Sequence, residues 1–143
     1  MMKKYIVLFL VIVAACAETV EEPAEARREI TEVLENQKDS WNRGELEGYM
    51  DHYLNSANLT FHSGSSLIRG WEELNSMYQR NYSGEGMGVL AFSEVKINVL
   101  SQDASYVIGA WEVALPDTIK KGRFTLILRK LDGEWLIIHD HSS

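Results

Sequence analysis

Apolar residues recur at helical spacing in three stretches of the first half of the chain. Residues 24–42 carry them three or four positions apart, which predicts one buried stripe along a helix. Gly44 then favours a helix end, because glycine accepts the left-handed backbone found there. The same spacing at residues 46–54 and 71–82 predicts two more helices.

The period of the apolar pattern changes to two after the third helix, which is typical of strands. Four long strands are predicted, at residues 89–100, 104–115, 120–131 and 134–142. Asp132-Gly133 favours a tight hairpin between the last two. Two shorter strands are predicted between the second and third helices, at residues 59–62 and 66–69. Helices followed by long antiparallel strands predict a single α+β domain.

The last three predicted strands are apolar on both faces, whereas the strand at residues 89–100 has one polar face, marked by Lys96 and Asn98. A sheet that is apolar on both faces needs two covers, and the helices cover only one. A second copy of the chain is the simplest second cover, so we predict a homodimer through the outer sheet face. The residues expected at this interface are Trp111, Ile127, His139 and His141.

The composition is that of one ordinary globular domain. The chain has 143 residues, of which 45% are hydrophobic and 24% charged. Its net charge is −7, and no basic run follows the first few residues. Nothing would therefore offset the repulsion from phosphates, and nucleic-acid binding is excluded.

The first residues have the layout of an export signal. Lys3 and Lys4 precede a short apolar run at residues 5–13, and small residues then lead to Cys16. The run is too short to cross a bilayer as a helix. The stretch resembles a bacterial lipoprotein signal, in which cleavage falls before the cysteine and the cysteine is lipidated. An ordinary secretory signal with an incidental cysteine is the alternative.

The lipoprotein resemblance implies a division of the chain into three parts. These are a signal peptide at residues 1–15, an acidic tether at 16–23 and a folded domain at 24–143. The residue after Cys16 is Ala17 and not an aspartate. By resemblance to Gram-negative lipoproteins this favours the periplasmic face of the outer membrane, with the lipid as the only membrane contact. Cys16 is the single cysteine, so no disulfide holds the domain.

Three stretches and the order of the predicted elements resemble the nuclear transport factor 2-like superfamily. The stretches are WNRGELEGYMDHY, RGWEELNSMYQRNY and GRFTLILRKLDGEWLIIHDHSS. Over residues 25–143 the chain is most similar to SnoaL-like proteins and to the association domain of calcium/calmodulin-dependent kinase. The resemblance implies a curved antiparallel sheet wrapped around three N-terminal helices, a cystatin-like cone with a conical pocket that pairs through its outer face. The fold hosts isomerases, cyclases, dehydratases and non-catalytic proteins, so it implies an architecture and no particular reaction.

His139 and His141 are two positions apart on the last predicted strand, so they share one face with Trp135. Histidines at this spacing can bind zinc, but a catalytic site needs a third protein ligand. His52 and His62 are candidates that no spacing ties to the pair. We therefore interpret the pair as packing and hydrogen-bonding groups of the dimer face, and we expect no metal and no cofactor.

Asp140 points to the opposite face, which the superfamily resemblance places on the pocket side together with Glu112. A carboxylate on an apolar pocket floor has a raised pKa and can act as a general acid or base. Two such acids can have their pKa values pushed apart, as acid–base chemistry requires. The alternatives are that Asp140 bonds a backbone amide or a helix end, and that Glu112 is a solvated charge at the rim.

The chain has enough aromatic residues to line an apolar cavity, although most aromatic stripes belong to cores. The candidates for ligand contact are Trp41, Tyr49, Tyr53, Phe61, Trp71, Tyr78, Phe92 and Phe124. We therefore expect a lipid-anchored envelope protein that binds a small, mostly apolar molecule. One alternative is an enzyme of the SnoaL or ketosteroid isomerase kind, with Asp140 or Glu112 moving a proton next to a carbonyl. A protein-interaction scaffold without pocket function is the other.

Overall fold

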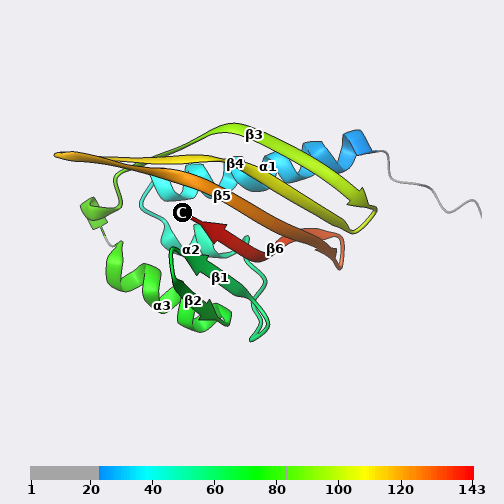
Figure 1. Ribbon diagram of the computed structural model, residues 1–143, viewed down its shortest axis with the longest axis horizontal. Coiled ribbons are helices and arrows are strands. Elements are labelled where there is room, and N and C mark those ends of the chain that lie inside the picture. The colour runs from blue at the N-terminus through cyan, green and yellow to red at the C-terminus, as the bar shows by residue number, and fades with distance from the viewer. Residues whose placement is uncertain (1–22, 83) are drawn as a thin grey trace, which may run out of the picture.

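Three helices pack against a curved six-stranded sheet, as Figure 1 shows. The computed structural model describes residues 23–82 and 84–143. Its helices are α1 (Pro23–Asn42), α2 (Leu46–Met50), α3 (Trp71–Asn81) and a short 3₁₀ helix η1 (Gly84–Met87). Its strands are β1 (Thr60–Ser63), β2 (Ser66–Arg69), β3 (Val89–Ser101), β4 (Ala104–Leu115), β5 (Thr118–Leu131) and β6 (Glu134–Ser142). The predicted α+β class is confirmed. No helix in the described ranges has the length and hydropathy needed to cross a membrane.

The strands form one sheet in the order β2-β1-β6-β5-β4-β3. Neighbouring strands are antiparallel except β1 and β6, which are parallel, with Thr60 opposite His139 and Ser63 opposite Ser142. The sheet is therefore mixed, which corrects the antiparallel sheet expected from the sequence. The parallel pair arises because the long intervening chain lets the last strand run back alongside β1 in the same direction.

A β-bulge in β6 changes the face that each of its residues occupies. Ile127 of β5 lies opposite His139, but the next residue, Leu128, lies opposite Ile137. Ile138 is therefore an extra residue in the ladder, and the alternation of side chains reverses beyond it.

This bulge explains one wrong face assignment. Simple alternation puts Trp135 and Ile137 on the same face as the two histidines, but both are buried in the core. Beyond the bulge Asp140 also points inward and is buried, whereas His139 is half-buried and His141 is exposed. The aspartate and the histidines therefore lie on opposite faces of the sheet, as expected from the sequence. Trp135, in contrast, lies on the inner face with Asp140 and not with the histidines.

A second irregularity bends β3 between Ser93 and Lys96, where its register with β4 shifts. Glu94 adopts a positive φ of 53° there, and its carboxylate accepts a hydrogen bond of 2.7 Å from the Arg123 guanidinium. Bulges increase the local twist of a sheet. The two bulges, in β3 and β6, account for part of the curvature seen in Figure 1.

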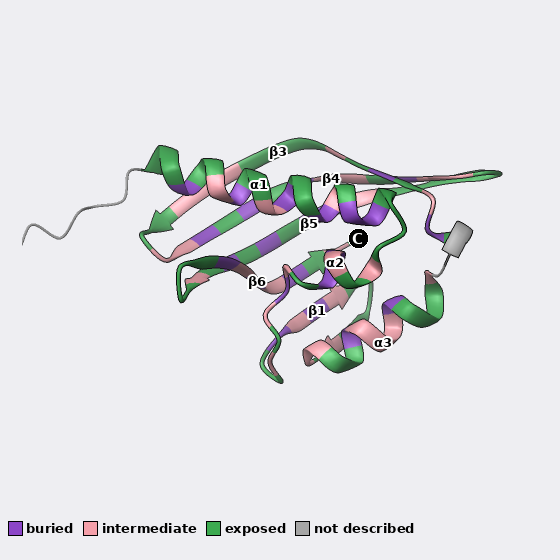
Figure 2. Cartoon of the chain, turned by 180° about the vertical axis from the view of Figure 1, so that it is seen from behind, coloured by how far each residue is buried: buried purple, intermediate pink, exposed green. Residues whose placement is uncertain are grey.

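Helix α1 packs along the sheet through one stripe of buried residues, which Figure 2 shows in purple on its sheet-facing side. The stripe comprises Ala26, Ile30, Leu34, Gln37, Ser40 and Trp41. At its C-terminal end the Asn42 amide donates to the backbone oxygen of Leu90 over 3.0 Å and accepts from its backbone N–H over 2.7 Å. Asn42, the second residue of the Trp-Asn-Arg-Gly stretch, thus fastens α1 to β3.

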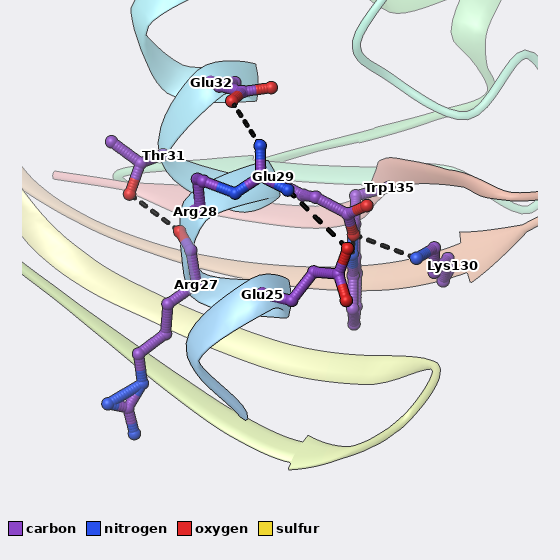
Figure 3. Close-up of polar contacts among 8 residues, drawn as sticks. All are labelled: Glu25, Arg27, Arg28, Glu29, Thr31, Glu32, Lys130 and Trp135. Atoms are coloured by element: carbon purple, nitrogen blue, oxygen red, sulfur yellow. Dashed lines mark hydrogen bonds and ion pairs between the residues drawn. The ribbon is translucent and has the colours of Figure 1, made fainter. Parts of the chain in front are cut away.

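Glu29 fastens the first half of α1 to the far hairpin of the sheet, as Figure 3 shows. Its Oε2 accepts hydrogen bonds from Lys130 Nζ at 2.9 Å and from the Trp135 indole at 3.0 Å. The hydrogen bond from Lys130 lowers the pKa of Glu29, and the bond from Trp135 adds to this effect. The neighbouring Arg28 instead pairs with Glu32 in solvent.

Candidate functional site: a tyrosine-lined pocket above a buried aspartate

A cavity of about 150 Å³ lies between the helices and the inner face of the sheet. Seven of the eight aromatic residues predicted to contact a ligand line it: Trp41, Tyr49, Tyr53, Phe61, Tyr78, Phe92 and Phe124. The eighth, Trp71, is half-buried and donates its indole hydrogen to the Met50 backbone oxygen over 3.2 Å, outside the lining. The cavity has the size that holds a single benzene-like ring. Contact of these residues with a ligand stays a prediction.

Asp140 lies buried on the floor of this cavity. The Tyr53 hydroxyl donates to its Oδ2 over 2.7 Å, and the Ser142 hydroxyl donates to its Oδ1 over 2.8 Å. Burial raises the pKa of Asp140 to about 6, against the opposing effect of these two hydrogen bonds. The carboxyl group therefore changes its charge around pH 6.

Backbone contacts bring Tyr53 to Asp140. The segment that follows α2 runs beside β6, where Tyr53 forms a parallel bridge with Ile137. Leu54 donates its N–H to the Ile137 oxygen, and Ile137 donates to the His52 oxygen, both over 2.9 Å. This bridge ends one residue before the β6 bulge. The bulge then turns Asp140 inward, onto the same side as the Tyr53 ring.

Three tyrosine hydroxyls extend the polar floor. The hydroxyl of Tyr49 lies 3.3 Å from that of Tyr53 and 3.3 Å from that of Tyr78. Burial raises the pKa of Tyr49 to about 12 and the pKa values of Tyr53 and Tyr78 well above their usual range. All three therefore keep their protons at neutral pH and can donate hydrogen bonds. With Asp140 they form a continuous chain of four oxygen-bearing groups.

Edge-to-face ring contacts fix the orientation of these tyrosines. The ring centroid of Trp41 lies 5.1 Å from that of Tyr49 and 6.1 Å from that of Tyr78. Trp41 is itself held by a 3.0 Å hydrogen bond from its indole to the Met87 oxygen. Such contacts are favourable for aromatic rings. The hydroxyls are thus presented by a rigid aromatic wall.

Trp111 lines the cavity from β4, which corrects its predicted position on the outer face. Val107 and Val113, four and two positions away along the strand, are buried on the same side. The indole Nε1 of Trp111 is buried and has no hydrogen-bond partner in the described part of the chain.

Glu112 is exposed and lies opposite Lys121 in the β4–β5 ladder, so its predicted place beside the pocket is wrong. It follows the alternation of β4, in which Tyr106 and Ile108 are also exposed on the outer face. A role for Glu112 as the second acid next to Asp140 is therefore not supported by the geometry.

The histidines lie on the outer face of the sheet, where β1 contributes a third one. His62 lies opposite His141 in the β1–β6 pair, and its ring centroid is 5.5 Å from that of His139 and 5.8 Å from that of His141. The Nδ1 atom of His139 lies 2.7 Å from the Thr60 hydroxyl. Partial burial lowers the pKa of His139 most, and the nearby His62 and His141 lower it further. Within the described ranges no group of three or more His, Cys, Asp or Glu side chains is placed to hold a metal ion.

Seven further residues line the cavity that were not predicted from the sequence, and Trp111 was expected on the other face. The seven are Gln37, Ser63, Tyr82, Leu90, Val113, Leu126 and Ser142. Strand alternation contained the signal for three of them, because Leu126 is in phase with Phe124, Val113 with Trp111, and Ser142 with Asp140. Leu90 is likewise in phase with Phe92, and Tyr82 follows Tyr78 by one helical turn, so a periodic signal was present for these two as well.

The family model of the SnoaL-like domain matches residues 30–143 of this sequence. The chain therefore belongs to the SnoaL-like domain family. No curated protein matches it in sequence.

Solved structures agree with this placement. An NTF-2 like protein of unknown function from Shewanella oneidensis MR-1 is 35% identical, with a TM-score of 0.80 over 82% of this chain and 98% of that one. A nuclear transport factor 2-like superfamily protein from Salmonella enterica serovar Typhimurium LT2 is 19% identical, with a TM-score of 0.71 over 85% and 92% of the two chains. A protein of unknown function with a cystatin-like fold from Nostoc punctiforme PCC 73102 is 16% identical, with a TM-score of 0.65 over 81% and 88%. The expected superfamily and cystatin-like fold are confirmed.

Proposed function

We propose that this protein binds a small, uncharged, mostly apolar molecule that carries an oxygen acceptor, such as a ring ketone. The observation that carries the proposal is the Tyr53–Asp140 pair, which faces an aromatic cavity of about 150 Å³. A pocket with apolar walls and a few convergent polar groups is the usual form of a small-molecule site. The hydroxyls of Tyr49 and Tyr78 supply donors for the ligand oxygen, and Asp140 supplies another below about pH 6, where it is protonated.

The charge of the pocket supports a neutral ligand. None of the side chains that line the cavity in the described part of the chain is Lys, Arg or His. A carboxylate or phosphate ligand would lose its hydration without gaining a counter-charge, and it would meet Asp140 as well. An uncharged carbonyl compound avoids both penalties.

Substitution at the pocket mouth tests this proposal with a matched control. Ser63 lines the cavity from an exposed position at the end of β1, and Ser66 lies opposite it in the β1–β2 hairpin without lining the cavity. We expect acetophenone, used as the probe ligand, to bind the wild type and Ser66→Trp, and to lose binding in Ser63→Trp, as measured by ligand-observed NMR. Binding that persists in Ser63→Trp, or a wild type that binds no neutral ring ketone, would contradict pocket binding and favour a scaffold.

Catalysis of proton transfer next to a carbonyl is the second candidate. It is favoured by the pKa of Asp140, which burial raises to about 6, because a general base works best when its pKa is near the operating pH. In this proposal Asp140 removes a proton from the carbon next to the ligand carbonyl, and a tyrosine hydroxyl stabilises the oxygen that becomes negative. Glu112 takes no part in this proposal because it lies on the opposite face.

Deuterium exchange distinguishes an enzyme from a binder. We expect an enzyme to exchange the methyl protons of acetophenone for solvent deuterium, with a rate that rises around pH 6 and is lost in Asp140→Asn. Binding without exchange above the buffer rate would leave the binder as the function. The exchange is read from the loss of the methyl signal in the proton NMR spectrum.

We also propose that the protein is attached to the cell envelope through a lipid on Cys16. The predicted signal peptide and nearly all of the tether lie outside the described residues. The resemblance of residues 1–16 to a lipoprotein signal supports the proposal. Cells given an alkyne analogue of palmitate should label the wild type and leave Cys16→Ala unlabelled, and a labelled Cys16→Ala protein would contradict the anchor.

We further propose that two copies pair through the outer sheet face. Tyr106, Ile108 and Ile127 are exposed there and neighbour one another, since Tyr106 lies opposite Ile127 in the β4–β5 ladder. His139 and His141 lie beside Ile127 on the same face, next to β1. An exposed apolar patch of this kind is typical of an interface between copies of a chain.

A further inference from the structure

The indole of Trp111 presents a hydrogen-bond donor that none of the described residues satisfies. Its Nε1 is buried, belongs to a residue that lines the cavity, and has no partner among the described residues. The other three tryptophans all donate their indole hydrogens, to Met87, Met50 and Glu29. Buried donors without a partner are rare in folded proteins, because the lost hydration is not replaced. Among the described residues the exception at Trp111 therefore favours an acceptor from a bound molecule.

Glycine at position 122 makes room for this indole. Gly122 lies directly opposite Trp111 in the β4–β5 ladder. A Cβ atom at this position would come within 2.9 Å of Trp111 Nε1 and within 1.6 Å of the Ser143 oxygen. That oxygen already accepts a hydrogen bond from the Arg123 N–H. The indole is thus packed over a glycine and lies close to the Ser143 oxygen, with which it forms no hydrogen bond.

Trp111 and Asp140 mark two separate polar points of one cavity. In the register of β5, Trp111 lies opposite Gly122, and Asp140 lies opposite Leu126. Four residues of an extended strand span about 13 Å, and β4 and β6 flank β5 on opposite sides, so the two backbone positions are more than about 13 Å apart. Phe124 and Leu126 line the cavity between them with apolar surface. A ligand that satisfies both points must therefore carry polar groups at both ends of an apolar body.

We propose that the Trp111 indole determines ligand specificity, by selecting flat, uncharged ring molecules with an acceptor oxygen at each end. One oxygen accepts from the tyrosine and Asp140 floor, and the other accepts from Trp111 Nε1. The inference rests on the proposed function, because it requires that the pocket bind a small molecule. To that function it adds a second contact with the ligand, at Trp111, and a narrower class of ligand, namely linear molecules with two acceptor oxygens.

A pair of nearly isosteric probes tests this inference. 1,4-Diacetylbenzene has a carbonyl oxygen at each end, and 4-isopropylacetophenone replaces one of them with a methyl group of similar size. We expect the ratio of their two dissociation constants to change about five-fold in Trp111→Phe, in the direction that disfavours the diketone, since one buried neutral hydrogen bond is lost. Trp71→Phe is the matched control, because its indole donates to Met50 outside the cavity, and it should leave the ratio unchanged.

The indole N–H signal in a proton–nitrogen NMR spectrum gives a second readout on the wild type. Through-space contacts with Gly122 identify the Trp111 signal among the four tryptophans. It should move downfield with the diketone and stay in place with 4-isopropylacetophenone. An unchanged ratio in Trp111→Phe, or an indole signal that moves equally with both probes, overturns the inference and leaves pocket binding intact. A wild type that binds neither probe contradicts the proposed function itself, and this inference with it.

Discussion

The phenolic oxygen of Tyr53 lies 2.7 Å from Oδ2 of Asp140, although 87 positions separate the two residues in the chain. Tyr53 follows α2, and Asp140 follows the bulge near the end of β6. The other donor to this carboxyl group, Ser142, is also uncharged. Neutral donors offset only part of the penalty for burying a charge, so the folded protein holds a proton on Asp140 up to a pH of about 6.

Replacement of Asp140 by asparagine should stabilise the protein above neutral pH. The pKa of Asp140 is higher in the folded than in the unfolded chain, so the folded state binds more protons between about pH 4 and pH 6. Its contribution to stability is therefore greatest at low pH, falls as pH rises through this window, and stays low above it. From a rise of about two pKa units, Asp140→Asn should gain on the order of 2–3 kcal/mol over the wild type at about pH 8.

Urea denaturation at about pH 4 and pH 8 measures this effect. The free energy of unfolding of Asp140→Asn should exceed that of the wild type at the higher pH, and the two should converge at the lower one. Asp132→Asn, on the exposed β5–β6 turn, is the control and should change little at either pH. A variant that is less stable than the wild type at about pH 8 would mean that the aspartate is charged and favourably bonded in the fold.

The sequence predicts the helices and strands well because each of them buries one continuous stripe or face. The stripe of α1 from Ala26 to Trp41 repeats at the helical period, so its pattern is visible without knowledge of its partner. The Asp132-Gly133 turn similarly locates the β5–β6 hairpin, where Asp132 adopts a positive φ of 50°. Local chemistry is sufficient for features of this kind.

The face assignments of the site were harder to predict, because they depend on features without a local signal. The bulge at Ile138 can be recognised only from the pairing of β5 with β6, and it reverses the faces of Trp135 and Ile137. Glu112 was assigned from a remote resemblance, although alternation puts it on the same face of β4 as Tyr106 and Ile108, which the structure exposes. The contact between Tyr53 and Asp140 depends on a bridge between distant segments, which a single sequence does not specify.

Glu29 should show the opposite pH dependence to Asp140. The hydrogen bond from Lys130 lowers the pKa of Glu29 in the folded chain, so its contribution to stability is present above the unfolded pKa and is lost as pH falls through the folded pKa. We expect Glu29→Gln to lose about 1 kcal/mol at neutral pH, and the loss should fade at about pH 4 and below. Urea denaturation at the two pH values measures this difference.

Glu32→Gln is the matched control for Glu29, one turn further along α1. Its ion pair with Arg28 is solvent-exposed on both sides, with side-chain exposures of 61% and 63%, so its removal should change the free energy of unfolding by less than about 0.5 kcal/mol. Equal effects of the two substitutions would show that the contact of Glu29 with Lys130 and Trp135 does not fasten α1 to the sheet.

Even a methyl side chain at Gly109 should destabilise the protein, because the ring of Phe124 packs over this glycine. A Cβ atom at Gly109 would lie 2.5 Å from Phe124 Cζ. Since Phe124 also lines the cavity, a displaced ring would reduce the space for a ligand. We expect Gly109→Ala to lose about 2 kcal/mol of stability, measured by urea denaturation, and to weaken acetophenone binding.

Gly86→Ala is the control for this substitution, because a Cβ atom there meets nothing within 4 Å. It should leave stability within about 0.5 kcal/mol of the wild type and leave binding unchanged. The double variant Gly109→Ala with Phe124→Leu should recover part of the lost stability, since the smaller side chain relieves the clash. A Gly109→Ala protein as stable as the wild type would indicate that the Phe124 ring does not lie where the structure has it.

The outer sheet face provides the last prediction, which concerns assembly. Ile127 is 38% exposed at the centre of the apolar patch formed with Tyr106 and Ile108. A lysine at this position would bury a charge without a partner if two such faces pack together. We therefore expect the wild type to be a dimer and Ile127→Lys to be a folded monomer at micromolar concentration, as measured by light scattering after size exclusion. Ile119, which is 59% exposed near the β4–β5 turn, is the control, and Ile119→Lys should remain dimeric. A monomeric wild type would contradict the pairing, and a dimer that survives Ile127→Lys would place the interface on another surface.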